Sequence, residues 1–200
     1  MHTKKVKLLN LENDEEISAI LEYTTTHSQT KIILTFNDTK ISAENYDLLD
    51  TLIDIRKQLN ERNLDILVNG SRKDISSSSR IKKAYSGEKT YRVRQGIGAG
   101  YEDIINILDP IKKEKLSTLE EQRKYHTIWI DSLAPTKGER EEAKKHPNGW
   151  IYRFDTAFSE DEAVPPEAIV GAWKVDEKGD LTGEWKDNKN FIPKELRDKK

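Results

Sequence analysis

The chain has 200 residues, of which 34% are hydrophobic and 35% are charged. This length suits one large domain or two small ones, and the hydrophobic fraction can supply a core. The 34 basic and 36 acidic side chains nearly cancel, so the net charge of −2 gives no global argument for binding nucleic acid or a membrane surface. The absence of cysteine excludes disulfides, thiolate metal sites and cysteine nucleophiles.

The N-terminal residues and the apolar runs predict a cytoplasmic protein without a membrane span. The N-terminus MHTKKVKLLN has an apolar patch shorter than the roughly 7–15 residues of a signal-peptide core. No run approaches the roughly 20 apolar residues that a spanning helix needs. We therefore expect the protein to stay in the compartment in which it is made.

The first third of the chain alternates between strand and helix patterns. Three β-rich runs predict strands at residues 5–9, 31–36 and 64–68. Between the first two, Asn13 predicts the cap of a helix with Ile17, Ile20 and Leu21 on its apolar face. Between the last two, Ser42 predicts the cap of a helix that ends near Arg62. This alternation is typical of right-handed crossovers, so the expected fold class is α/β, with a mainly parallel sheet and covering helices.

The C-terminal third carries three of the four tryptophans in short alternating runs, which predict strands with one buried face. These tryptophans are Trp150, Trp173 and Trp185. The turn residues 177–180 separate the last two runs and predict a hairpin. We therefore expect an α/β domain at residues 1–110, a polar connector at 109–116, and a smaller α+β domain at 117–195.

Three helices are predicted between the basic segment and the tryptophan-bearing strands. The first covers residues 101–108 and ends before a proline, which drives the preceding residue out of the helical region. The other two begin at the capping boxes 117–120 and 136–139.

Residues 71–94 form the one local charge anomaly of the chain. Its basic side chains are Arg72, Lys73, Arg80, Lys82, Lys83, Lys89, Arg92 and Arg94, against only Asp74 and Glu88. A loop after a parallel strand is a usual ligand position, and serine hydroxyls with cationic side chains would bind a phosphate or an acidic protein surface. The alternative is a solvated loop, because the serine tract 76–79 cannot pack. The partner-binding candidates here are Arg72, Lys73, Arg80, Lys82 and Lys83.

The remaining candidates are an acidic run and one histidine. Glu160, Asp161 and Glu162 are candidates for partner binding, with a solvated loop as the alternative, because the run lacks the glycine of a calcium loop. His146 is a candidate catalytic histidine, with an interaction with a helix dipole as the alternative. The glycines of GIGAG do not have the spacing of a dinucleotide fingerprint. No catalytic residue, metal site or cofactor is therefore predicted.

Two motifs near the C-terminus, HPNGWIYRFD and VPPEAIVGAWKVDEKG, resemble a module of bacterial polymorphic toxin and immunity loci, which serve competition between bacteria. ILVNGSRKDISSS, followed by KTYRV, is similar to a second bacterial α/β module without an assigned reaction. The resemblance implies a bacterial cytosolic immunity protein that binds and blocks a cognate toxin. It assigns no functional residue.

Three functional hypotheses follow from these observations. A highly charged chain with nearly zero net charge favours a protein-binding factor, because localised charges give specific association rather than bulk attraction. The second hypothesis is a toxin enzyme that acts on a nucleotide or nucleic acid through residues 72–94 and His146. The third is a nucleic-acid-binding module in which basic residues are interleaved with Tyr85 and Tyr91. Nucleic acid is not the favoured partner, and the oligomeric state stays open.

Overall fold

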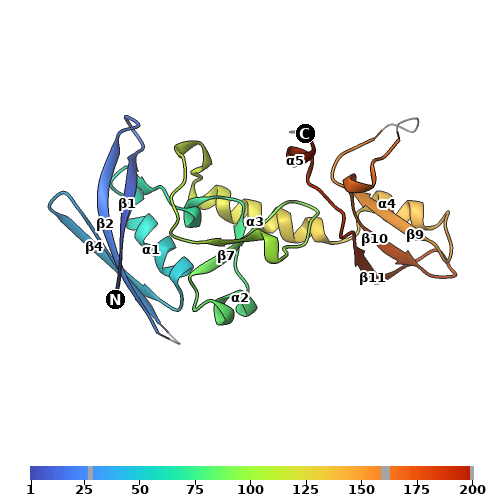
Figure 1. The fold of residues 1–200 in the computed structure, drawn as a ribbon, viewed down its shortest axis with the longest axis horizontal. Coiled ribbons are helices and arrows are strands. Elements are labelled where there is room, and N and C mark those ends of the chain that lie inside the picture. The colour runs from blue at the N-terminus through green and yellow to red at the C-terminus, as the bar shows by residue number, and fades with distance from the viewer. Residues whose placement is uncertain (27–28, 159–162, 199–200) are drawn as a thin grey trace. The chain divides into compact units, whose positions relative to one another are not determined.

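The computed structural model describes residues 1–26, 29–158 and 163–198, and it contains two compact units (Figure 1). The first unit consists of Met1–Arg94 and Gly98–Ile130, and the second of Gln95–Ile97 and Asp131–Lys200. Each unit has its own cluster of buried apolar side chains. The connector expected at residues 109–116 lies within the first unit.

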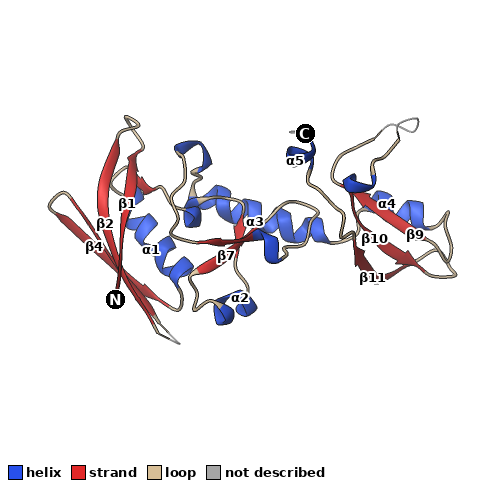
Figure 2. Ribbon diagram, viewed as in Figure 1, coloured by secondary structure: helices blue, strands red, loops and turns tan. Residues whose placement is uncertain are grey.

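The first unit is built on a five-stranded antiparallel sheet with the order β4-β3-β2-β1-β5 (Figure 2). Its strands are β1 (His2–Asn10), β2 (Glu16–Thr25), β3 (Thr30–Phe36), β4 (Thr39–Asn45) and β5 (Leu64–Ile66). The first four strands follow one another as a meander. The chain then crosses over and places β5 antiparallel to β1, with Leu8 opposite Ile66.

Helix α1 (Leu48–Asn60) covers one face of this sheet (Figure 2). The Asp47 side chain caps the helix by accepting a hydrogen bond from the backbone N–H of Asp50 at 2.9 Å. Leu52 and Leu59 recur on the helical face that meets the sheet, and both are fully buried. Alternate apolar residues of β1, β2 and β3 complete this core.

The predicted fold class, a mainly parallel α/β sheet with covering helices, is wrong because two stretches expected to be helical are strands. Every strand pairing among the described residues is antiparallel. The stretch after Asn13 forms β2, in which Ala19, Leu21 and Tyr23 alternate toward the core. The stretch after Ser42 completes β4, and the helix begins only at α1.

The rest of the first unit contains a small antiparallel sheet with the order β6-β7-β8 and two helices. These elements are β6 (Ile75–Ser76), α2 (Ser79–Ala84), β7 (Lys89–Arg92), β8 (Ile104–Asn106) and α3 (Leu119–Leu133), the last of which extends into the second unit. The helix predicted at 101–108 is wrong, since a single 3-10 turn at Tyr101–Asp103 leads directly into β8. Helix α3 forms where predicted, but its capping box pairs Thr118 with Glu121, one residue later than expected.

The second unit contains a three-stranded antiparallel sheet with the order β11-β10-β9 and two short helices. They are α4 (Lys137–Ala143), β9 (Trp150–Phe154), β10 (Ile169–Val175), β11 (Leu181–Asp187) and α5 (Lys194–Arg197). The tryptophan-bearing strands and their hairpin therefore form where predicted. In β9, however, the alternating apolar residues Trp150, Tyr152 and Phe154 are not the buried face, since Ile151 and Arg153 are buried while Tyr152 and Phe154 are exposed. The capping box of α4 also forms, between Thr136 and Glu139.

Trp173 is the centre of the core of the second unit. Its side chain is only 9% exposed, and its ring centroid lies 4.7 Å from that of Trp185, which is directly opposite it on β11. Ile151 and Ala143 belong to the same cluster. Gly171 is required beside it, because a Cβ atom there would lie 2.3 Å from the ring of Trp185.

Replacing Trp173 with alanine should lower the free energy of unfolding of the second unit by about 3–5 kcal/mol, because a large buried ring leaves a cavity. Urea unfolding followed by circular dichroism measures this change. The matched control is Tyr152→Ala, since Tyr152 lies on the other face of the sheet and is 53% exposed. A Trp173→Ala variant as stable as its control would show that this ring is not a core residue.

Candidate functional site

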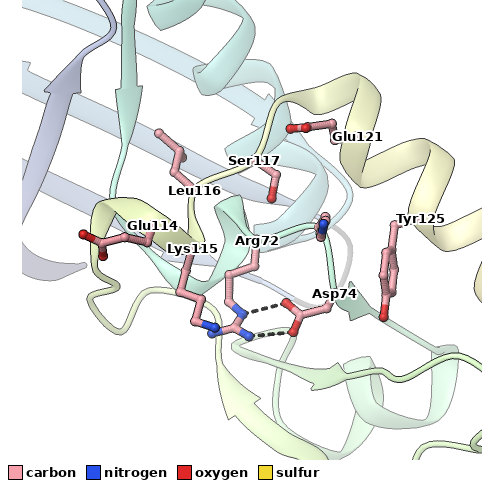
Figure 3. A pocket seen from close by; sticks show the side chains of 9 residues that line it. Arg72, Asp74, Glu114, Lys115, Leu116, Ser117, Glu121 and Tyr125 are labelled. Carbon is pink, nitrogen blue, oxygen red and sulfur yellow. Dashed lines mark hydrogen bonds and ion pairs between the residues drawn. The ribbon is translucent and has the colours of Figure 1, made fainter. Parts of the chain in front are cut away.

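A cavity of about 300 Å³ lies in the first unit where residues 72–74 meet the stretch 114–125, which is distant from them in sequence (Figure 3). Its lining contains basic, acidic, hydroxyl and aromatic side chains: Arg72, Lys73, Asp74, Glu114, Lys115, Leu116, Ser117, Glu121 and Tyr125. Arg72 and Lys73 are the two predicted partner-binding residues that the structure brings into this cavity.

The first segment reaches the cavity through a single 3-10 turn, Asn69–Ser71, which follows β5. Gly70 lets this turn approach α1, because a Cβ atom at that position would lie 2.3 Å from Leu52. The chain then presents Arg72, whose Nε and Nη2 atoms donate to the two carboxylate oxygens of Asp74 at 2.7 and 2.6 Å (Figure 3). The Arg72 guanidinium therefore enters the cavity as one half of a bidentate ion pair.

The carboxylate of Asp74 is held in its charged form. Burial by itself raises its pKa, but hydrogen bonds and charge attraction from Arg72, followed by the charge of Arg92, outweigh burial and lower the pKa below its ordinary value. The Nε atom of Arg92 lies 3.3 Å from the same carboxylate. One acidic residue thus compensates two of the basic residues that made the segment stand out in the sequence.

The opposite wall of the cavity is the first part of α3. Glu121 accepts a hydrogen bond from the backbone N–H of Thr118 at 2.8 Å, which is the main reason that the pKa of Glu121 is lowered. One turn further along, the ring of Tyr125 lies beneath Lys73, with the ammonium 5.9 Å from the ring centroid. The ammonium of Lys73 and the carboxylate of Glu121 therefore lie on the same exposed rim with opposite charges.

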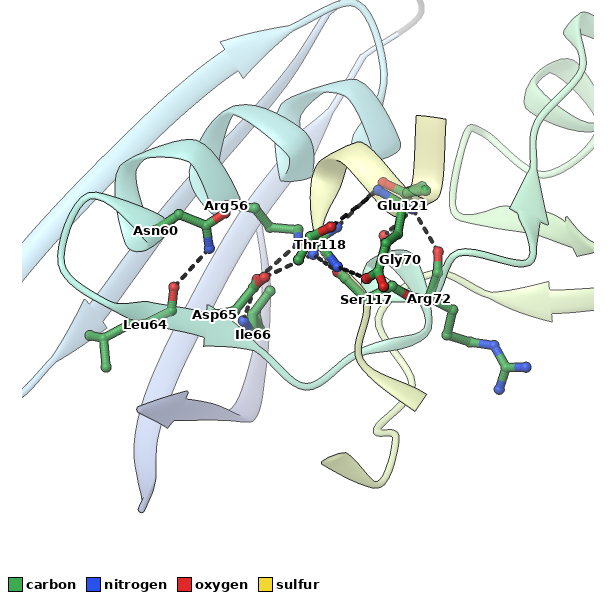
Figure 4. Close-up of polar contacts among 11 residues, drawn as sticks. Arg56, Asn60, Leu64, Asp65, Ile66, Gly70, Arg72, Ser117, Thr118 and Glu121 are labelled. Atoms are coloured by element: carbon green, nitrogen blue, oxygen red, sulfur yellow. Dashed lines mark hydrogen bonds and ion pairs between the residues drawn. The ribbon is translucent and has the colours of Figure 1, made fainter. Parts of the chain in front are cut away.

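A buried polar network fixes these segments from behind (Figure 4). Arg56 of α1 is fully buried, and its Nε and Nη2 atoms both donate to Asp65 of β5 at 2.8 Å. The same guanidinium donates to the backbone oxygen of Ser117 and to the side chain of Gln122. Gln122 in turn donates to the backbone oxygens of Gly70 and Arg72, at 3.0 and 2.8 Å. The cavity walls are therefore joined to one another through Arg56.

Arg80, Lys82 and Lys83, the other predicted basic residues, lie on α2 and do not line this cavity. Lys82 pairs with Asp47, the cap of α1, and lies 3.8 Å from Asp50. Arg80 donates to the hydroxyl of Tyr101 at 2.9 Å, while Lys83 is exposed. The contacts of Arg80 and Lys82 therefore hold α2 against its neighbours, and they do not form a cluster of unpaired positive charges.

The pairing continues at Arg94, which binds Asp103 at 2.8 Å. Four of the eight basic residues of this segment, Arg72, Lys82, Arg92 and Arg94, therefore face carboxylates, so about half of its positive charge is compensated. This compensation lowers the charge that the segment can offer to a phosphate backbone.

The other sequence candidates lie elsewhere. Glu160, Asp161 and Glu162 are outside the described residues. His146 is exposed, and its Nε2 atom lies 3.0 Å from a carboxylate oxygen of Glu142, which is one turn earlier in the chain. Within the described ranges, no group of three or more histidine, cysteine or acidic side chains is arranged to hold a metal ion.

Several lining residues were missed by sequence reasoning, above all Asp74, Glu121 and Tyr125. In the sequence, Asp74 is only one of two acidic residues among eight basic ones, so it has no signal of its own. Glu121 had a usable signal, because a glutamate three residues after Thr118 is a capping box that fixes the start of α3. No local pattern could show that α3 would lie beside residues 72–74.

In comparisons with known proteins, no family model and no curated protein sequence matches this chain. None of the described helices combines the length and the apolar character needed to cross a membrane.

The ion pair at Asp74 should make the stability of the first unit depend on pH in the acid range. Because the folded state lowers the pKa of Asp74, its stabilising contribution is complete above the unfolded value of about 3.9 and is lost as the pH falls through the folded value. Asp74→Asn should therefore be less stable than the wild type at pH 7, and this difference should shrink below about pH 4. Urea unfolding at a series of pH values tests this, and a difference that stays constant with pH would contradict it.

Proposed function

We propose that the chain is an immunity protein that binds and neutralises a cognate toxin domain, with the cavity of the first unit as part of its binding surface. The likeness of residues 146–155 and 164–179 to modules of polymorphic toxin loci supports the choice of partner. The main support for this binding site is a set of exposed side chains of opposite charge on the rim of the cavity. The positive charges are those of Lys73 and Lys115, and the negative charges are those of Glu114 and Glu121.

Mixed charge of this kind suits the recognition of a folded protein. Opposite charges placed at fixed points steer a complementary surface and reject surfaces of the wrong pattern, whereas a single-sign patch attracts many partners. Leu116 and Tyr125 are half-buried in the lining of the cavity and add apolar area beside the charged groups. Interfaces commonly combine apolar contacts with polar and charged ones.

The rigidity of the cavity walls also favours binding. Ordering a mobile loop at an interface reduces affinity, because immobilised side chains and backbone lose entropy. Here the buried contacts of Arg56 and Gln122 already fix residues 70–72 and the start of α3. The backbone beside Lys73 and Glu121 is therefore fixed before a partner arrives.

Charge reversal on the rim tests the proposal. Lys73→Glu and Glu121→Lys should each weaken binding to the toxin domain encoded beside this gene by at least about tenfold, equivalent to roughly 1.4 kcal/mol, and should abolish protection of a strain that expresses that toxin. Lys137→Glu is the matched control, since the Lys137 side chain is 90% exposed and lies on α4, in the other unit. Isothermal titration calorimetry measures the affinities.

Two different failures can be distinguished. A wild-type chain that neither binds the neighbouring gene product nor protects the strain would disprove the immunity function. A wild-type chain that protects, together with rim variants that bind and protect as well as the Lys137→Glu control, would place the binding surface elsewhere.

A further inference from the structure

A second, larger cavity of about 500 Å³ lies on the five-stranded sheet of the first unit, and the proposed toxin binding does not use it. It is lined by residues from β1, β2 and the end of β3: Lys5, Val6, Lys7, Ser18, Ala19, Ile20, Thr35, Phe36 and Asn37. Its volume is within the roughly 300–1,000 Å³ of small-molecule sites.

The strand register places the polar part of this cavity on the face that α1 leaves uncovered. Val6 and Ala19 pair with each other and are buried in the core on the α1 side. Because side chains alternate along a strand, the neighbouring pair of Lys5 and Ile20 points to the opposite face. Thr35 lies opposite Ile20 on the other side, so these three residues form one cross-strand row.

The cationic groups of this cavity are only weakly compensated. Lys5 and Lys7 are two residues apart on β1, which puts both ammonium groups on the same face. Lys7 forms a long ion pair, in which its ammonium lies 3.8 Å from the carboxylate of Glu16. No acidic residue appears in the described lining, whereas the hydroxyls of Ser18 and Thr35 and the amide of Asn37 add hydrogen-bond donors.

An apolar surface lies directly beside these donors. Ile20 is 39% exposed although it is in the middle of a strand, at a position where the neighbouring outward side chains are polar. Exposed apolar area next to two lysines fits a ligand that has an anionic end and an aliphatic body. A purely polar anion would leave Ile20 in water, and a neutral aliphatic molecule would leave the lysines uncompensated.

We infer that this cavity binds a small amphiphilic carboxylate, whose carboxylate pairs with Lys5 and Lys7 and whose aliphatic chain lies on Ile20. The carboxylate can pair with both ammonium groups, because it has two oxygens and accepts several hydrogen bonds. The chain of the ligand gains affinity by leaving water, up to about fourfold for each methylene that is buried. This site is independent of the mixed-charge rim around Lys73.

A homologous series of carboxylates tests the inference with the full-length protein. Butanoate, hexanoate and octanoate should bind with a stoichiometry of one, and the dissociation constant should fall by up to about fourfold per methylene. NMR titration measures the dissociation constants, and the shifted amides should lie in residues 5–7, 18–20 and 35–37. Acetate and inorganic phosphate should bind far more weakly than octanoate, as should 1-octanol.

The double variant Lys5→Gln with Lys7→Gln should weaken octanoate binding at least tenfold while leaving the melting temperature unchanged, because both side chains are exposed. The matched control is Lys31→Gln, an exposed lysine on β3 at the other end of the same sheet face. Affinities that do not change along the carboxylate series, shifts outside the cavity, or equal octanoate binding by the double variant and the control would each overturn the inference.

Discussion

The buried ion pair of Arg56 and Asp65 is the constraint on which the candidate binding surface depends. Their side chains are 0% and 3% exposed, so neither charge has water to stabilise it. An arginine cannot escape this cost by losing its proton, and each N–H group left without an acceptor would be destabilising. Asp65 satisfies two of these groups, and the backbone oxygen of Ser117 and the side chain of Gln122 accept from the guanidinium as well. The requirement to satisfy one guanidinium thus determines where the start of α3 can lie.

The second unit uses the same device with different partners. Arg153 donates to both carboxylate oxygens of Glu139 at 2.7 Å, and to the backbone oxygens of Ser132 and Ala134. Its guanidinium also lies 5.7 and 5.4 Å from the ring centroids of Trp173 and Trp185. Well-packed apolar residues could replace such a pair at little cost in stability, so a buried arginine contributes most by fixing which segments meet. In both units the segments fixed in this way are loops and helix ends that no sheet hydrogen bonds would hold.

The sequence predicted elements with strong local signals and missed those that depend on tertiary context. The tryptophan-bearing strands and α4 form where expected because period-2 alternation, turn residues and a capping box are strong local signals, although the apolar alternation of β9 marks its exposed face and not its buried one. The sequence of residues 16–25 predicts a helix because Ile20, on the outward face of β2, adds an apolar residue that interrupts the alternation of apolar and polar residues. When β2 and β4 are not recognised as strands, the remaining predicted strands alternate with predicted helices, which is the pattern of a parallel sheet. The position of Arg56 is a sequence signal for this network. It lies between Leu52 and Leu59 on the apolar stripe of α1, where a charged side chain requires a buried partner such as Asp65.

A double-mutant cycle at Arg56 and Asp65 tests the constraint most directly. Arg56→Met and Asp65→Leu should each lower the free energy of unfolding by about 3–5 kcal/mol, because each leaves one buried charge without its partner. The double variant, which buries neither charge, should be much more stable than the sum of the single changes implies. Urea unfolding at pH 7 gives all four free energies. Single changes that simply add in the double variant would show that the two residues are not coupled, and that another interaction holds the cavity walls together.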